Sequence, residues 1–272
     1  MDTDPDWIDS VMTGEQSKLF DPDSYFAGYE STHNNYSIGR YTYGGMMIDS
    51  IMDIIRKKVE SWDKLLSFQV WNSTSGGTGS GFGSWLFEQL KDSYAEKITE
   101  WYSVFPTESV YNAPLEYYNA TLGFNLLIEN TDFVACFDNN SLYNISHKLC
   151  SKSTPNFQTL NTMIATQMSS TSWTVRFHGS VSTSIQKMLL NWCPFPRIHF
   201  YATSYTPFVP LISTRIEPQL TAKEMIHELV QGRNMMCKFD TSNRRALTSY
   251  AIFRGSMSEL DIETSISNII NA

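Results

Sequence analysis

The sequence lacks several features that mark common protein classes. Its cysteines are few (Cys136, Cys150, Cys193 and Cys237) and show no CxxC spacing, which favours buried free thiols in a reducing compartment over zinc ligands or disulfides. The histidines lack the spacing of metal ligands, and no internal repeat is found. No apolar run approaches the length of a membrane span. We therefore expect a cytoplasmic protein without membrane insertion.

Basic residues are also scarce relative to acidic ones. The 272 residues include 20 Lys and Arg against 28 Asp and Glu, which gives a formal net charge of −8. The basic clusters Arg56–Lys58 and Arg244–Arg245 are too short for the electrostatic footprint of a nucleic-acid binder. The charge balance predicts no nucleic-acid partner. The length is sufficient for a large core in one or two domains.

The most informative segment that is present is the run SGGTGSG at Ser75–Gly81. It follows the apolar stretch 68–71 and precedes a helical pattern at 85–90, so it reads as a strand, a tight loop and a helix N-terminus. Backbone N–H groups at such a place bind phosphate well. A flexible linker is the alternative, but large apolar side chains on both sides disfavour it. The run lacks the Lys of a P-loop and is not a dinucleotide-binding GxGxxG.

Apolar periodicity predicts alternating helices and strands in the first half of the chain. Ile48, Ile51, Ile55 and Val59 share one helical face. Strands are expected at 68–71, 101–105 and 133–137, with helices ending near 94, spanning 118–129 and starting around Asn139. This alternation indicates a parallel sheet with helices on both faces.

The second half shows the same two patterns. Thr154–Pro155 reads as an N-cap and a proline at the first helical position, opening a helix with Leu160, Ile164 and Met168. Strands are expected at 198–202 and 247–253, and a closing helix at 257–270. These elements predict a second α/β unit.

The glycine run resembles the signature loop of the tubulin and FtsZ superfamily at every position. Further blocks resemble tubulin more than FtsZ, in order from about residue 2 to about residue 270. They are YNATL at 118–122, ENTD at 129–132, DN at 138–139 with LY at 142–143, PFPRIHF at 194–200, and FRG at 253–255 with MS at 257–258.

This resemblance implies an α/β fold with a Rossmann-like, parallel-sheet GTP-binding domain over 1–153, a core helix over 154–176 and an incomplete second α/β domain over 177–272. Measured against the family, the chain begins inside the third strand and lacks the first βα unit with its phosphate loop. It also ends before the two long C-terminal helices and the acidic tail. We therefore expect a divergent member that is truncated at both ends.

The resemblance also implies a site for GTP or GDP with Mg²⁺. The nucleotide-binding positions carried over from the family are Asn34, Ser73, Gly76, Gly77, Thr78, Gly79, Ser80, Glu116, Asn139, Phe157 and Asn161. Asn34 would approach the γ-phosphate and Glu116 the ribose. Asn139 and Asn161 would read guanine, because an amide offers both a donor and an acceptor, and Phe157 would stack on the base.

Two of these assignments have plain alternatives. Asp4 would hold Mg²⁺ through water, where the family commonly has Glu, but it could equally belong to a solvated acidic terminus. Asn34 could simply favour a turn. For Phe157, core packing is the alternative, although its i, i+4 spacing to Asn161 puts both on one helical face.

Lys187 bears on the subfamily. In α-tubulin the matching helix carries a Glu that positions water against the GTP of the adjoining subunit, whereas β-tubulin has Lys. The resemblance thus implies a β-tubulin-like chain that forms microtubules with α-tubulin and other tubulin subunits, with microtubule-associated proteins or folding chaperones as further partners. No catalytic residue is assigned to this chain, because the neighbouring α subunit would complete hydrolysis.

Other interpretations stay open. Tyr102–Pro106 and Tyr205–Pro207 are nearer γ-tubulin, which keeps a nucleation role in view. A degenerate tubulin paralogue could bind tubulin or a chaperone without hydrolysing GTP, since the missing βα unit would remove phosphate donors. Lys187 and the tubulin-like blocks disfavour a free-standing FtsZ-like GTPase.

Overall fold

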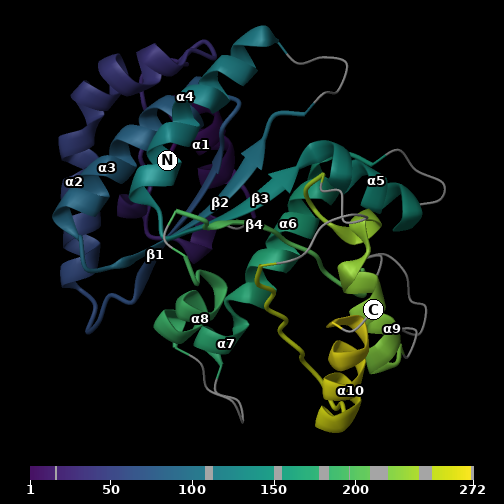
Figure 1. The fold of residues 1–272 in the computed structure, drawn as a ribbon. Coiled ribbons are helices and arrows are strands. Elements are labelled where there is room, and N and C mark those ends of the chain that lie inside the picture. Colours follow the sequence, from purple (N-terminus) through teal and green to yellow (C-terminus); the bar gives the residue numbers. More distant parts are fainter. Residues whose placement is uncertain are drawn as a thin grey trace. The chain divides into compact units, whose positions relative to one another are not determined.

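A computed structural model of the chain describes residues 1–15, 17–107, 113–149, 155–177, 184–195, 197–208, 220–238 and 247–270 (Figure 1). The chain divides into two compact units. Unit 1 comprises Met1–Val134 with Phe195–His199, and unit 2 comprises Ala135–Pro194 with Phe200–Ala272. The domain boundaries at 153 and 176 stay a prediction, because a division by compactness does not test them.

A four-stranded sheet has the order β1-β2-β3-β4. The strands are β1 (Ser67–Ser73), β2 (Ile98–Phe105), β3 (Phe133–Asp138) and β4 (Phe200–Ala202). β1 and β2 run parallel, in a register that pairs Ser67 with Ile98 and Ser73 with Val104. The expected parallel α/β fold is confirmed. The expected strand at 198–202 is shorter than predicted, since β4 begins at Phe200.

Helices connect the strands of unit 1. α3 (Gly83–Ser93) lies between β1 and β2 in the chain, and α4 (Pro114–Asn130) lies between β2 and β3. α2 (Gly44–Glu60) packs on α3 through a buried apolar cluster of Met47, Ile48, Ile51, Phe82, Leu86 and Leu90. Figure 1 shows α2, α3 and α4 along the sheet. The helix predicted from Ile48, Ile51, Ile55 and Val59 is confirmed.

Two π-helical turns adjoin these helices. They are η3 (Ile38–Tyr43), which runs into α2, and η4 (Thr78–Phe82), which runs into α3. Arg40 of η3 donates to Glu88 of α3 at 2.7 Å, and its guanidinium lies 5.2 Å from the centre of the Trp85 ring. This half-buried ion pair and the cation–π contact hold η3 against α3. Unit 1 also contains α1 (Pro5–Thr13), η1 (Ser17–Leu19) and η2 (Pro22–Ser24).

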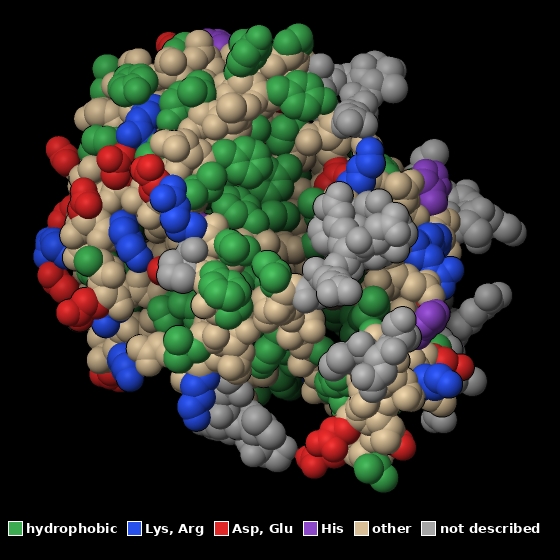
Figure 2. Space-filling view, in the orientation of Figure 1, with side chains coloured by type: hydrophobic (Ala, Val, Ile, Leu, Met, Phe, Trp, Pro, Cys, Tyr) green, Lys and Arg blue, Asp and Glu red, His purple; other side chains and the backbone are tan. Residues whose placement is uncertain are grey.

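The outer face of α4 is unusually apolar. Leu115, Tyr118 and Leu122 are 51%, 67% and 50% exposed, and their spacing places them on one helical stripe. Figure 2 shows hydrophobic side chains gathered over the start of this helix. Contiguous apolar surface of this kind is typical of a contact with another protein.

Unit 2 contains the remaining helices. They are α5 (Asn139–Leu149), α6 (Phe157–Thr171), α7 (Trp173–Arg176), α8 (Ile185–Trp192), α9 (Ala222–Val230), η5 (Gly232–Asn234) and α10 (Glu259–Ile270). The expected helix start around Asn139 is confirmed, and the closing helix begins two residues later than predicted. Lys187 is exposed on the first turn of α8, whose N-cap is Ser184.

Two predictions about unit 2 were wrong. The core helix starts at Phe157 because the Asn156 side chain accepts from the Thr159 N–H and so caps it, whereas Thr154 lies outside the described residues. The expected strand at 247–253 is absent, since this described segment has no strand beside it. Its contacts are made by side chains instead: Tyr250 packs edge-on against Trp192.

The cysteines agree with the expectation of free thiols. Cys136, Cys193 and Cys237 are thiols outside any disulfide and are only partly buried, and Cys150 lies outside the described residues. Burial raises the pKa of the Cys136 thiol to about 12, with a further contribution from the nearby Cys237. Cys136 is therefore protonated and poorly nucleophilic at neutral pH. Among the described helices, none is long and apolar enough to cross a membrane.

The carboxyl group of Glu100 is buried in the sheet. Glu100 of β2 is 5% exposed and accepts from Gln69 of β1 at 2.9 Å and from the Tyr102 hydroxyl at 3.3 Å. Burial raises the pKa of Glu100, and the hydrogen bonds oppose this only in part. The folded state holds the Glu100 proton more tightly than the unfolded state does. The stability that this proton contributes is therefore fully present below the unfolded-state pKa and is lost as the pH rises through the folded-state pKa.

We predict that Glu100→Gln raises the urea midpoint at pH 7 and flattens the decline of stability with pH. The neutral amide accepts the same hydrogen bonds without the desolvation of a charge. Urea unfolding between pH 4 and pH 8 measures this, with Glu96→Gln at an exposed position of the same unit as the control. A Glu100→Gln curve that parallels the wild-type curve would contradict the prediction.

Candidate functional site

The glycine run forms the predicted strand, loop and helix start. Thr74, Ser75 and Gly76 follow β1 directly, and the chain then enters η4 and α3 through Gly77. Within the described residues, the N–H groups of Gly76, Gly77, Thr78 and Gly79 have no acceptor, as is usual for a first helical turn. The loop therefore presents free donors at the positive end of a helix dipole, which is a favourable place for an anion.

The glycines of the run serve two purposes. A Cβ at Gly77, Gly79 or Gly81 would lie under 3.0 Å from a backbone oxygen, belonging to Asn35, Ser73 and Tyr36 respectively. Gly76 is different: a Cβ there would meet only Asn34 Oδ1, at 3.9 Å. Close backbone packing thus requires the three later glycines, and only Gly76 leaves open space beside Asn34.

Asn34 lies beside the loop in a turn of unusual backbone. His33 and Asn34 have φ values of 47° and 57°, a region that Asn and His tolerate better than most residues. The plain turn and the phosphate contact proposed for Asn34 are therefore compatible. Asn119 of α4 donates to the Asn34 backbone oxygen at 2.9 Å and to the Ser75 oxygen at 2.9 Å.

Hydroxyl groups surround the start of η4. Thr78 Oγ1 lies 2.7 Å from Thr3 Oγ1 and 3.4 Å from Thr32 Oγ1, and both of these threonines are buried. The Ser73 hydroxyl accepts from the Ser75 N–H at 3.3 Å. The Ser80 hydroxyl donates to the Gly76 oxygen at 2.6 Å and is buried, which gives it a supporting place in the loop.

The Asp4 side chain caps a helix, whether or not it also binds a metal ion. It is the N-cap of α1, where its Oδ1 accepts from the Asp6 N–H at 3.1 Å and Pro5 begins the helix. The other oxygen, Oδ2, accepts from nothing in the part of the chain that the structure describes. No group of three or more His, Cys, Asp or Glu among the described residues could hold a metal. A Mg²⁺ ion here would rely on phosphate and water for most of its ligands.

The remaining predicted positions also lie at helix starts. Glu116 is half-buried on the first turn of α4 in unit 1. In unit 2, Asn139 is the first residue of α5, which the Asp138 carboxylate caps through the Asn140 N–H at 3.0 Å. Phe157, 68% exposed, and Asn161 lie one turn apart at the start of α6. Their shared helical face is confirmed, and their contacts with a base stay a prediction.

A cavity of about 1000 Å³ opens beside the glycine run in unit 1. Thr32, Asn34 and Gly76–Gly79 line one part of it, and the rest follows β1 with apolar walls from α2 and α3. Lys58 also lines it, but this ammonium pairs with Asp21 at 2.6 Å. Backbone donors, more than a side-chain cation, would therefore hold an anion at this loop.

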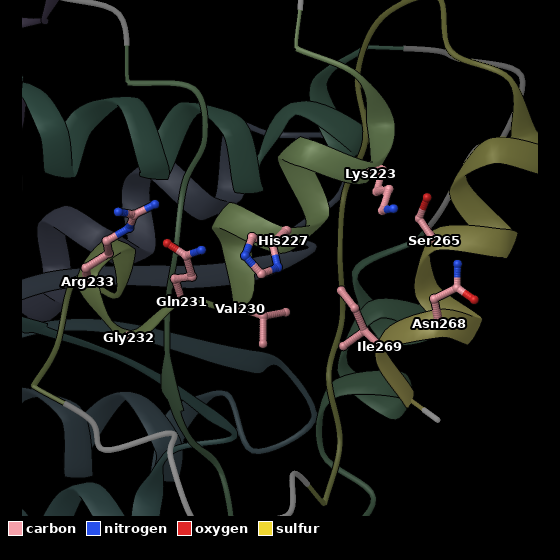
Figure 3. A pocket seen from close by; sticks show the side chains of 9 residues that line it. All are labelled: Lys223, His227, Val230, Gln231, Gly232, Arg233, Ser265, Asn268 and Ile269. Atoms are coloured by element: carbon pink, nitrogen blue, oxygen red, sulfur yellow. The ribbon is translucent and has the colours of Figure 1, made fainter. Parts of the chain in front are cut away.

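A second cavity of about 710 Å³ lies in unit 2 between α9 and α10 (Figure 3). Lys223, His227 and Val230 come from α9, and Ser265 and Asn268 from α10. Figure 3 shows Lys223 and Ser265 in the space between the two helices. Lys223 lies on the first turn of α9 and Gly232 begins η5, so polar and cationic side chains line this cavity in place of the glycine run of the first.

Comparison with protein families agrees with the geometry of the loop. Residues 1–147 match the model of the Tubulin/FtsZ family, GTPase domain, which is more than half of the chain. The chain belongs to the Tubulin/FtsZ family. Residues 196–272 match the Tubulin C-terminal domain. The family match implies binding of GTP or GDP, and members of the tubulin family generally associate with other tubulin subunits.

Three residues around the glycine run were not predicted from the sequence to belong to the site. Thr3 and Thr32 surround Thr78, and Asn119 joins the Asn34 turn to the glycine run. Asn119 lies in the YNATL block at 118–122, which served only as evidence of the resemblance to tubulin. Isolated threonines carry no local signal, because their contacts with Thr78 span 75 and 46 positions of sequence.

We predict that Gly81→Ala destabilises the chain by about 1–3 kcal/mol, because its methyl group would overlap the Tyr36 carbonyl. Gly45→Ala in α2 is the matched control: nothing lies within 4 Å of the added Cβ, so we expect a gain of about 0.5–1 kcal/mol from helix propensity. Urea denaturation measures both. Equal effects in the two variants would show that the packing of η4 on the Asn35–Arg40 segment is unimportant.

Proposed function

We propose that this protein is a GTP-binding cytoskeletal protein of the β-tubulin type. The observation that carries the proposal is the row of free N–H groups from Gly76 to Gly79, at a helix start beside Asn34. In this proposal the β- and γ-phosphates lie against that row. The Asn34 amide reaches the terminal phosphate, and Glu116 contacts the ribose. Asn139, Asn161 and Phe157 recognise the base.

Asp4 is the proposed residue for Mg²⁺. Its free Oδ2 would hold the ion through water, next to Thr3, whose hydroxyl touches Thr78 of the phosphate loop. Bound Mg²⁺ would neutralise charge on the phosphates. The chain's own contribution is to position the nucleotide. Lys187 cannot act as a carboxylate, so hydrolysis would depend on a neighbouring subunit.

The proposed partners are α-tubulin and other tubulin subunits, in microtubules of the cytoplasm. The exposed apolar stripe of Leu115, Tyr118 and Leu122 on α4 supports association with another protein. The same proposal includes the location of this chain in microtubules and its binding to microtubule-associated proteins or folding chaperones.

A degenerate paralogue that binds tubulin without hydrolysing GTP is the second candidate. In this proposal the β1 edge of the described sheet offers too few phosphate donors for tight binding. Each missing charge-assisted hydrogen bond would weaken binding by about 1.5–3 kcal/mol.

Nucleotide binding is tested by Gly76→Ala. The methyl group meets only Asn34 Oδ1, so folding should be unchanged, but it enters the space proposed for phosphate. We expect the affinity for GTP to fall by about tenfold or more, which is about 1.4 kcal/mol, with an unchanged thermal midpoint. Competition against a fluorescent GTP analogue measures this, with Gly45→Ala as the control. Full affinity in folded Gly76→Ala would place the phosphates elsewhere.

Assembly is tested by sedimentation with polymerising tubulin. A β-type subunit should enter the polymer in GTP and stay in the supernatant in GDP, because nucleotide lies at the contact between subunits in this proposal. The paralogue hypothesis predicts equal sedimentation with stabilised microtubules in GTP, in GDP and without nucleotide. Gly76→Ala should lose sedimentation only under the first hypothesis.

A further inference from the structure

The side chain of Asn119 makes several hydrogen bonds near the glycine run. It lies on α4, is 3% exposed, and uses both ends of its amide. Nδ2 donates to the Ser75 and Asn34 backbone oxygens at 2.9 Å each, and Oδ1 accepts from the Tyr36 N–H at 3.1 Å. One buried amide therefore joins α4 to two separate loops.

Both loops line the cavity beside the glycine run, and neither has a regular backbone. His33 and Asn34 lie in the left-handed region, and Ser75 and Gly76 form a bend between β1 and η4. Close backbone packing of Asn35 on Gly77 brings the two loops together. The bonds from Asn119 add a direct link, because they end on backbone atoms of each loop.

Asn119 also orients the Asn34 side chain. Its Nδ2 also lies 3.3 Å from Asn34 Oδ1, a longer contact that shares one of the two Nδ2 hydrogens with a backbone oxygen, so the carbonyl end of that amide is directed towards Asn119. In the described part of the chain, Asn34 Nδ2 donates to no atom. The donor end is thus left for a ligand. A reversed amide would present an oxygen to phosphate and repel it.

We propose that Asn119 is the positioning residue for the terminal phosphate: it holds the Asn34 amide with its N–H groups towards the γ-phosphate and links the Asn34 turn to the glycine run. This inference rests on the proposed nucleotide function. It adds that preference for GTP over GDP depends on a residue that touches neither nucleotide.

The test compares affinities for GTP and GDP, both with Mg²⁺, by competition against a fluorescent GDP analogue. In Asn119→Ala we expect the affinity for GTP to fall about tenfold and that for GDP by less than about threefold. Asn125→Ala is the matched control, an exposed asparagine of the same helix, and should change neither value. A purely structural role would lower both affinities equally.

A double-mutant cycle tests the route through Asn34. Asn34→Gly keeps the left-handed turn and should reproduce the selective loss of GTP affinity, and the double variant should lose no more than either single one. Additive losses would overturn the inference. If Asn119→Ala does not fold, Asn34→Gly alone carries the test, because the route through Asn34 predicts the same selective loss of GTP affinity.

The outcomes separate this inference from the function on which it rests. A folded wild-type chain that binds neither nucleotide overturns both. A wild-type chain that binds GTP and GDP, with an unchanged ratio in Asn119→Ala, overturns the role of Asn119 alone.

Discussion

Two π-helical turns, η3 and η4, contact each other backbone to backbone, and the candidate site depends on this contact. A Cβ at Gly39 would overlap the Gly77 carbonyl, and one at Gly81 would overlap the Tyr36 carbonyl. Glycine is therefore required on both sides of the contact. The arrangement brings the Asn34 turn, which precedes η3, beside the start of η4. π-helical turns of this kind are frequent at functional sites.

The contact explains how the site can function without a lysine. η4 is held by packing and by the bonds of Ser80, Thr78 and Asn119, so its free N–H groups keep their directions before any ligand arrives. Preorganised donors avoid the cost of ordering a loop when a ligand binds. The glycine run lies within residues 1–147, which match the GTPase domain of the Tubulin/FtsZ family.

Much of unit 1 could be predicted from sequence because its signals are local. The apolar face of α2 lies within 17 residues, and the strand, glycine loop and helix follow one another within residues 67–93. Two errors arose where local signals compete or need a partner. Asn156 caps α6 in preference to the predicted Thr154, and the apolar segment at 247–253 has no strand beside it within the described residues. The role of Asn119 could not be predicted because its hydrogen bond to Asn34 joins residues 85 positions apart in the sequence.

The most direct test of this account is the affinity of the purified, folded chain for GTP, GDP and ATP, measured with and without Mg²⁺. The account predicts guanine-selective binding that Mg²⁺ strengthens for GTP, because the loop is proposed to hold the phosphates and the amides of unit 2 to read the base. Equal affinity for ATP, or no binding by a chain shown to be folded, would contradict it.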